Sequence, residues 1–390
     1  MIDFWYEYPI ARVVFRPGAV DSVGTEVAAL GVERVLLIAT GSAADVAARI
    51  VDQLGDRLVG VFDTVIQHVP QRLAEAARLR AEDLAADVVV SVGGGSATGL
   101  AKAVAVARGV PIVAVPTTYA GSEATPVYGI TGTHKITGRD PRARPRVVVY
   151  DPDLTMGMPP RLTATSGLNA VAHAVQAPAG PSANPISTMY GLEALRWLRD
   201  ALPRAVHDDP HARAQALLGA HLAGTAFAGA GSGLHHKLCH VLGGDLGLGH
   251  ADVHAVLLPH VVAYQQSIMP DAFAPVAAVL AGGKARTALH VTAGGDATSA
   301  LGTTAGGDAA SVSGMTGGGD AASALRALAG DLGAPVSLAE IGAPAERLPA
   351  VAEHAARELA DAGVRPLIDE ARLRELLDDA HSGRPPKLYP

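Results

Sequence analysis

The chain has 390 residues, 49% of them hydrophobic, which is enough for two domains with substantial cores. Its formal net charge is −7 and it carries no block of basic residues, which disfavours nucleic acid and membranes as partners and favours a small-molecule substrate. The single cysteine, Cys239, cannot form an internal disulfide, and the N-terminus lacks the apolar run of a signal peptide, so we expect a cytoplasmic protein.

The first 150 residues alternate apolar runs with helical patterns. We predict strands at residues 10–16, 35–39, 58–62, 88–92, 112–115 and 147–150, and helices at 19–30, after 42, at 72–84 and at 97–107. The runs at 35–39 and 88–92 are apolar or nearly so throughout, as expected for strands covered on both faces. This alternation predicts an α/β, Rossmann-like domain with a parallel, doubly wound sheet.

The strand at 88–92 leads directly into three glycines and a serine, after which a helix begins. Such a turn offers free backbone N–H groups and the positive end of a helix dipole, which suit a pyrophosphate. It is not the Gly-x-Gly-x-x-Gly fingerprint, so a plain tight turn is the alternative. Hydroxyl residues follow two other strands at the edge of the sheet where such folds bind ligands. The predicted coenzyme-binding residues are Thr40, Gly93, Gly94, Gly95, Ser96, Thr117, Thr118 and Ser122.

Two features bear on which anions the domain binds. Thr40 stands where an acidic residue would bind a ribose and repel a 2′-phosphate, so the sequence leaves both NADH and NADPH open. Residues 134–146 carry five Lys or Arg side chains in an acidic protein. They predict either a solvated loop or a cationic rim that collects carboxylates or phosphates.

Strand signals end near residue 150, and helical spacing of Ala, Leu and Gly follows. We therefore predict a first domain at 1–158 and a helical, catalytic domain at 159–390. Residues 293–328 form three tandem twelve-residue units. We expect the first two, at about 293–316, to be a mobile surface insertion without a catalytic role, and the third to continue as a helix over 321–332.

Histidines are concentrated in the predicted helical domain. His236 and His240 are four residues apart, so they share one face of a helix, and His250 follows after glycines that let the backbone turn back. Asn169 and His173 have the same four-residue spacing on another helix. Any one of these side chains could be a core or surface residue, but the four polar groups at four-residue spacing lie in Ala-rich helices and need partners. We predict that they form one cluster.

With these motifs, the chain resembles the maleylacetate reductases of the iron-containing alcohol dehydrogenase superfamily. The resemblance covers most of residues 10–265. It rests on residues 93–96 with Lys102, on Pro116-Thr-Thr-Tyr-Ala-Gly-Ser-Glu123, on residues 137–141 and 167–173, and above all on His235-His-Lys-Leu-Cys-His-Val-Leu-Gly-Gly244. The resemblance implies a Rossmann-like N-terminal domain and an all-α C-terminal domain, as in the dehydroquinate synthase-like fold, usually in a homodimer.

The resemblance also bears on a metal. Metal-dependent relatives hold iron or zinc with an Asp and three His, and these positions fall here on Asn169, His173, His236 and His250, with His240 nearer the nicotinamide. Without the carboxylate, affinity for a hard divalent cation should drop. We predict a reaction without metal.

The implied reaction is the NADH- or NADPH-dependent reduction of the carbon–carbon double bond of 2-maleylacetate to 3-oxoadipate, in the degradation of aromatic compounds. Histidine suits an acid role because its pKa lies near neutrality, so His240, His236 and His173 are assigned to substrate anchoring, enolate stabilisation or proton delivery. The predicted catalytic residues are His240, His236, His173 and Lys237. The predicted substrate-binding residues are Asn169, His235, His250, Tyr119, Arg139 and Arg142, and Lys135 joins the coenzyme set.

Departures from the family pattern leave alternatives open. Gly249 precedes the last histidine where Pro is usual, and Gln176 replaces an expected Glu. A biosynthetic relative recruited to another conjugated or keto acid is the first alternative. The others are a metal-dependent alcohol dehydrogenase, which Asn169 opposes, and a non-redox binding protein that retains the fold, which the glycine loop opposes.

Overall fold

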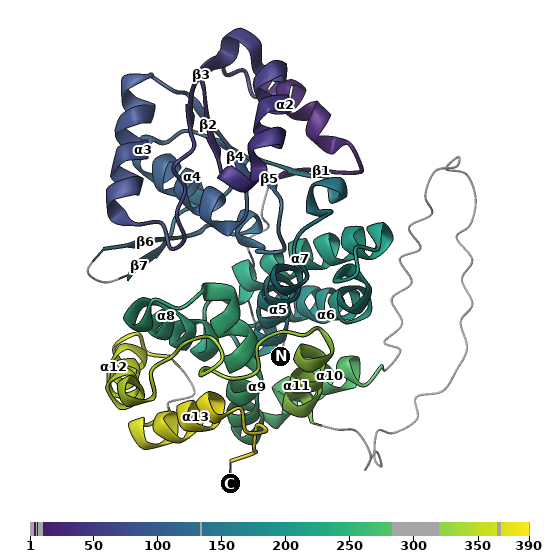
Figure 1. The fold of residues 1–390 in the computed structure, drawn as a ribbon, viewed down its shortest axis with the longest axis vertical. Coiled ribbons are helices and arrows are strands. Elements are labelled where there is room, and N and C mark those ends of the chain that lie inside the picture. Colours follow the sequence, from purple (N-terminus) through teal and green to yellow (C-terminus); the bar gives the residue numbers. More distant parts are fainter. Residues whose placement is uncertain are drawn as a thin grey trace, which may run out of the picture.

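The computed structural model describes residues 4, 6, 11–132, 135–282, 320–364 and 368–389. An α/β part lies above a helical part when the longest axis is vertical (Figure 1). This arrangement confirms the predicted fold class of a parallel sheet followed by helices. The predicted insertion at 293–316 lies outside the described residues.

The sheet of the α/β part has six parallel strands in the order β1-β8-β5-β4-β2-β3. The strands are β1 (Arg12–Phe15), β2 (Val35–Ala39), β3 (Leu58–Phe62), β4 (Val88–Gly93), β5 (Ile112–Pro116) and β8 (Val147–Tyr150). Every residue of β2, β4, β5 and β8 is buried, as their apolar sequences predict. The predicted strands are confirmed with shifts of at most a few residues at their ends.

Helices cover both faces of this sheet. They are α1 (Val23–Ala29), α2 (Ala44–Leu54), α3 (Gln71–Asp83) and α4 (Gly95–Arg108). Because side chains alternate along a strand, Val35 and Leu37 of β2 pack with α1 and α2, whereas Leu36 and Ile38 pack with α3 and α4. The carboxyl ends of β2, β4 and β5 remain at one edge, where the chain meets the helical part.

A short antiparallel hairpin was missed by the sequence patterns. Strands β6 (Val127–Thr131) and β7 (Lys135–Arg139) form a two-stranded sheet, and β7 includes part of the segment for which a loop or rim was expected. Their Thr, Lys, Arg and Gly residues lack a clear alternation of apolar side chains, so the strand signal is weak. The first half of the cationic segment is therefore a strand.

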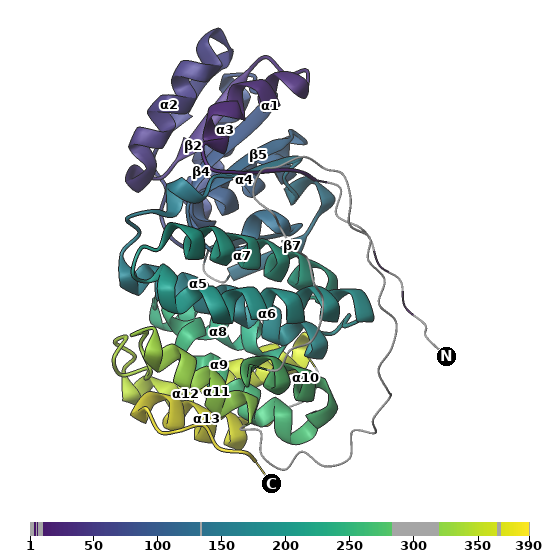
Figure 2. The same ribbon diagram turned by 90° about the vertical axis from the view of Figure 1, so that its right-hand side faces the viewer.

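The helical part begins at Pro160 and has nine described helices. They are α5 (Pro160–Gln176), α6 (Pro185–Ala205), α7 (Pro210–Ala230), α8 (Leu234–Leu246), α9 (His250–Ile268), α10 (Pro270–Leu280), α11 (Ala321–Asp331), α12 (Leu348–Asp361) and α13 (Glu370–Ser382). The helix expected at 321–332 is confirmed by α11. Figure 2 shows α5, α6 and α7 stacked beneath the sheet. The predicted domain boundary at residue 158 lies between the end of β8 and the start of α5, and it stays a prediction.

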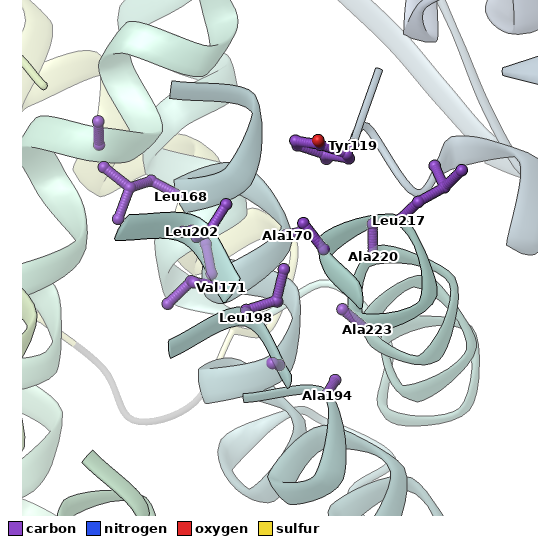
Figure 3. Packing of buried hydrophobic residues seen from close by; sticks show 14 of the residues in the cluster. Tyr119, Leu168, Ala170, Val171, Ala194, Leu198, Leu202, Leu217, Ala220 and Ala223 are labelled. Atoms are coloured by element: carbon purple, nitrogen blue, oxygen red, sulfur yellow. The ribbon is translucent and has the colours of Figure 1, made fainter. Parts of the chain in front are cut away.

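Small side chains let α5, α6 and α7 pack closely. Ala170, Ala194 and Ala223 are fully buried, and Leu198 and Leu202 fill the space between them (Figure 3). A side chain at Gly167 would lie 2.3 Å from Leu202 Cδ2, so close packing of α5 on α6 requires glycine there. This closely packed layer carries Asn169 and His173 on α5.

Among the described residues, no helix is long and apolar enough to cross a membrane.

Candidate active site

The first element of the site is the turn between β4 and α4. Gly94 is the N-cap of α4 and supplies no side-chain cap, so the first N–H groups of the helix are left to a ligand. The positive end of the helix dipole lies at the same place. The turn can therefore hold a phosphate, as the sequence predicts.

The glycines of this turn are required by close neighbours. Gly93 has a φ of +138°, and a Cβ there would lie 2.6 Å from Thr40 Oγ1. Cβ atoms at Gly94 and Gly95 would lie 3.1 Å from Thr118 and 3.2 Å from Ala120. The turn is thus a cradle, bare of side chains, between the loops that follow β2 and β5. The residues present fit the pyrophosphate of a dinucleotide.

A buried lysine on α4 holds the next loop. Lys102 is fully buried, and its Nζ donates to the carbonyl oxygens of Ser122, Thr125 and Val127 at 2.6 to 2.9 Å. Burial lowers the pKa of Lys102 to about 7. The loop that follows β5 is therefore fixed to the helix that begins at the cradle.

The same loop touches the histidine cluster. Asn169 donates from Nδ2 to the Ala120 carbonyl at 3.2 Å, and Asn169 Oδ1 is buried without a hydrogen-bond partner among the described residues. Gly121 has a φ of +70°, and a Cβ there would lie 3.3 Å from His173 Nδ1. The coenzyme cradle and the histidines are thus joined by residues 120–127.

The predicted histidines form two stacked pairs. His173 lies on His236 with ring centroids 4.9 Å apart and planes 11° apart, and His240 lies on His250 at 5.6 Å and 25°. His254 links the pairs, with its ring 4.8 Å from His236 and 4.4 Å from His250. The expectation of one cluster is met by geometry, although the rings stack rather than point at one atom.

A cavity of about 250 Å³ opens beside the second pair. His240 and His250 form part of its helical wall with Cys239, and His68, Pro70 and Thr131 form part of its α/β wall. The segment on the α/β side has positive φ at His68 (65°) and at the β-branched Val69 (48°), which is an uncommon backbone for such residues. The cavity therefore lies between the two parts of the chain and is reached by one histidine pair.

Burial sets the charge of the inner histidines. It lowers the pKa of His173 to about 4 and that of His235 to about 3, and it lowers the pKa of His236 and His254 well below the usual value. These four imidazoles are neutral at pH 7. Because burial disfavours their charged form, it favours substrate anchoring or enolate stabilisation over proton delivery for His173 and His236.

Two predicted substrate contacts are turned away from the cavity. His235 is fully buried, and its Nε2 lies 3.0 Å from His254 Nδ1 in a hydrogen bond. Tyr119 is also fully buried, packed against α5 and α7 (Figure 3), with Thr155 and Arg213 beside its hydroxyl. Neither side chain lines the described cavity, so both assignments stay predictions.

Both arginines among the predicted substrate contacts have protein partners. Arg139 donates from Nη1 to the Ala228 carbonyl at 2.8 Å, and Arg142 pairs with Asp140 at 2.6 Å. Lys135 begins β7, and Lys237 is half-exposed on α8. The two arginines and Lys237 do not line the described cavity.

His254 and His68 were missed by the sequence patterns. His254 lies one helical turn after His250, so the four-residue spacing that identified His236 and His240 could have found it. His68 lies in an irregular segment before α3, where spacing carries no such signal. Only the fold brings it to within 6.4 Å of His250, measured between ring centroids.

The residues at the metal-binding positions of the family do not fit a metal ion here. Among the described His, Cys, Asp and Glu side chains, the trio with ligand atoms all within 4.8 Å of one another is His235, Cys239 and His254. His173, His236 and His250 do not converge in this way. Asn169 brings no negative charge to offset a divalent cation.

Two family models match the chain. The first, iron-containing alcohol dehydrogenase, matches residues 10–152, and the second, the C-terminal part of the Fe-containing alcohol dehydrogenase family, matches residues 163–310. The chain belongs to the iron-containing alcohol dehydrogenase family and is an oxidoreductase, which confirms the resemblance seen in its motifs.

Within the family, the chain is similar to maleylacetate reductases. The enzyme of Burkholderia cepacia is 40% identical over 386 residues, covering 98% of this chain and 99% of the relative. The crystal structure of maleylacetate reductase from Rhizobium sp. strain MTP-10005 is 39% identical, with a TM-score of 0.81 over 99% of this chain and 100% of that one. A putative alcohol dehydrogenase from Ralstonia eutropha JMP134 is 40% identical, with a TM-score of 0.85 and the same coverage.

Proposed function

We propose that this chain reduces the carbon–carbon double bond of 2-maleylacetate with NADH or NADPH, giving 3-oxoadipate in the degradation of aromatic compounds. The observation that carries the proposal is that residues 120–127 join a bare glycine cradle to a histidine cluster, and that the outer pair of this cluster lines a cavity. Full-length similarity to maleylacetate reductases supports this substrate over other conjugated acids.

The coenzyme would rest on the cradle at Gly93, Gly94 and Gly95, with Thr40 and Thr118 on either side. Bound NADH or NADPH supplies a hydride to the alkene carbon β to the ketone. Thr40 and the exposed Ser42 beside it carry no charge, so they accept a ribose hydroxyl and do not repel a 2′-phosphate. We therefore propose that both coenzymes are used.

His173 and His236, the inner pair, would stabilise the negative charge of the enolate while they remain neutral. Hydride addition places negative charge on the ketone oxygen as an enolate. Both ring nitrogens of His236 and Nδ1 of His173 are buried without a hydrogen-bond partner among the described residues, so they are available to a substrate. A neutral imidazole can donate an N–H to a developing enolate, and the low-dielectric surroundings strengthen that bond.

The proton for the α carbon comes from the outer pair. His240 and His250 are partly exposed and line the cavity, whereas His173 and His236 lie behind them. A proton donor must reach both the substrate and solvent, because it has to be protonated again after every turnover. We assign proton delivery to His240, with His250 stacked against it as its support.

We propose that this reaction needs no metal. Support comes from Asn169 in place of a carboxylate and from three histidines that stack or turn away instead of converging. The enolate charge is then stabilised by hydrogen bonds alone.

We also propose that the chain acts as a cytoplasmic homodimer.

The test is direct. Chelator-treated protein would be mixed with NADH or NADPH and freshly generated maleylacetate, and the loss of reduced-nicotinamide absorbance followed with product identification by mass spectrometry. We expect oxidation of either coenzyme and formation of 3-oxoadipate. Nicotinamide binding, seen by fluorescence, without turnover would reject maleylacetate and direct the search to other conjugated or keto acids.

A further inference from the structure

Three potential ligands for a soft cation meet behind the cavity. His235 and Cys239 lie one turn apart on α8, and His254 faces them from α9. All three side chains are fully buried. His235 Nε2 is 3.0 Å from His254 Nδ1 and 3.7 Å from Cys239 Sγ. The reaction proposed above uses none of these atoms.

Two of the three ligand separations are close to those around a bound d¹⁰ cation. Zinc lies about 2.0–2.1 Å from imidazole nitrogen and about 2.3 Å from thiolate sulfur, which places neighbouring ligand atoms roughly 3.3–3.8 Å apart in tetrahedral or trigonal geometry. The two distances measured from His235 Nε2 lie at or near this range. The ligand atoms of Cys239 and His254 lie within 4.8 Å of each other, so binding a cation would require this third separation to close by up to about 1 Å.

The chemistry of the donors selects the cation. A thiolate with two neutral imidazoles favours Zn(II) or Cu(I), and hard cations such as Mg²⁺ prefer oxygen. Metal binds the neutral imidazole and the thiolate, so these three side chains can each supply one ligand atom. Cys239 also forms part of the cavity wall, which provides a path from solvent.

We propose that His235, Cys239 and His254 form a binding site for a thiophilic d¹⁰ cation, distinct from the metal-ligand positions of the family at residues 169, 173, 236 and 250. Binding replaces the His235–His254 hydrogen bond with two N–metal bonds and one S–metal bond. Cys239 releases its thiol proton to solvent, so one proton leaves for each ion bound.

Occupation of the site would also restrain the candidate active site. The ring of His254 lies 4.4 Å from that of His250 and 4.8 Å from that of His236. A cation that fixes His254 removes the freedom of both rings to adjust to a substrate. We expect Zn(II) to lower turnover in proportion to its occupancy, a consequence that rests on the proposed function.

The test uses Co(II) as a spectroscopic substitute for Zn(II) in chelator-treated protein. The chain has one cysteine, so a thiolate-to-cobalt charge-transfer band can arise only from Cys239. We expect this band at one Co(II) per chain, its loss on addition of Zn(II), and its absence in Cys239→Ser. His260→Gln, which replaces another buried histidine of α9, is the matched control and should keep the band.

Two results would overturn the proposal. The first is the absence of a charge-transfer band in the wild-type protein, which needs no variant and no assumption about folding. The second is Co(II) binding that survives Cys239→Ser and is lost in His173→Gln, which would place the ion at the family positions. Because the band is read without substrate, a protein inactive on maleylacetate still gives a clear answer.

Discussion

The coenzyme cradle and the histidine cluster are built in opposite ways. The cradle has almost no side chains, because its function depends on backbone N–H groups and on glycines that leave room for phosphate. The cluster consists of side chains, and its charge state is set by how deeply each ring is buried. A backbone site depends on local sequence, whereas a buried side-chain site depends on the whole fold, so the two should respond differently to mutation and pH.

The largest effect is expected at the cavity end of the cluster. His240→Gln removes the proposed proton donor, and we expect kcat to fall by about 10²- to 10⁴-fold with little change in KM for the coenzyme. Steady-state kinetics with NADH and maleylacetate measure this. His211→Gln, at an exposed histidine of α7, is the control. Normal kcat in His240→Gln would move proton delivery to His250.

Low pH should destabilise the fold through the buried histidines of the cluster, whereas the cradle has no titrating side chain to respond. His173 titrates near 6.5 when unfolded and at about 4 when folded, so the unfolded chain binds more protons between these values. The contribution of neutral His173 to the free energy of unfolding is complete above pH 6.5. It decreases by about 1.4 kcal/mol per pH unit as the pH falls from 6.5 to 4. Urea unfolding of wild type and His173→Gln across this range measures it, and equal pH slopes in the two proteins would contradict the burial of a neutral His173.

The connection between the two regions can be weakened at Lys102. Lys102→Met removes the donor to the carbonyl oxygens of Ser122, Thr125 and Val127, and we expect the free energy of unfolding to fall by about 1–3 kcal/mol. KM for the coenzyme and kcat should both worsen, because this loop contacts the cradle and Asn169. An unchanged kcat with reduced stability would show that the loop does not position the site.

The smallest effect is expected at the cradle itself. Gly93→Ala places a Cβ 2.6 Å from Thr40 Oγ1, so we expect KM for NADH to rise about tenfold, which corresponds to about 1.4 kcal/mol, with kcat nearly kept. Gly109→Ala is the matched control, because Gly109 also has a positive φ but a Cβ added there would have no atom within 4 Å. A similar rise in KM in both variants would mean that general strain, not the cradle, is responsible.

The contrast also explains which features could be predicted from sequence. The apolar runs of β2 and β4 and the glycines after β4 indicate their structure locally, and the fold follows these predictions. The histidine cluster was predicted as a group, but not its internal order. His235 and His236 each have a His or Cys four residues further on, so spacing cannot say which one stacks on His173. Packing of α8 against α9 decides it, and buries His235 against His254.

The pKa values could not be predicted for the same reason. A histidine in a sequence has its ordinary pKa, and only the burial by α5, α8 and α9 makes His173 and His236 neutral. Tyr119 belongs to a motif that resembles a binding loop, although its ring lies in the core between α5 and α7. Residues of a recognised motif can therefore serve the fold and not the ligand.

The central claim is that neutral imidazoles and a backbone cradle suffice for the reduction without iron. The most direct measurement is the turnover number with NADH and maleylacetate across preparations that contain from zero to one iron per chain, with iron determined on the same samples. We predict a turnover number independent of iron content and full activity in the iron-free preparation. Turnover that rises in proportion to bound iron would contradict the claim and restore a catalytic metal to residues 169, 173, 236 and 250.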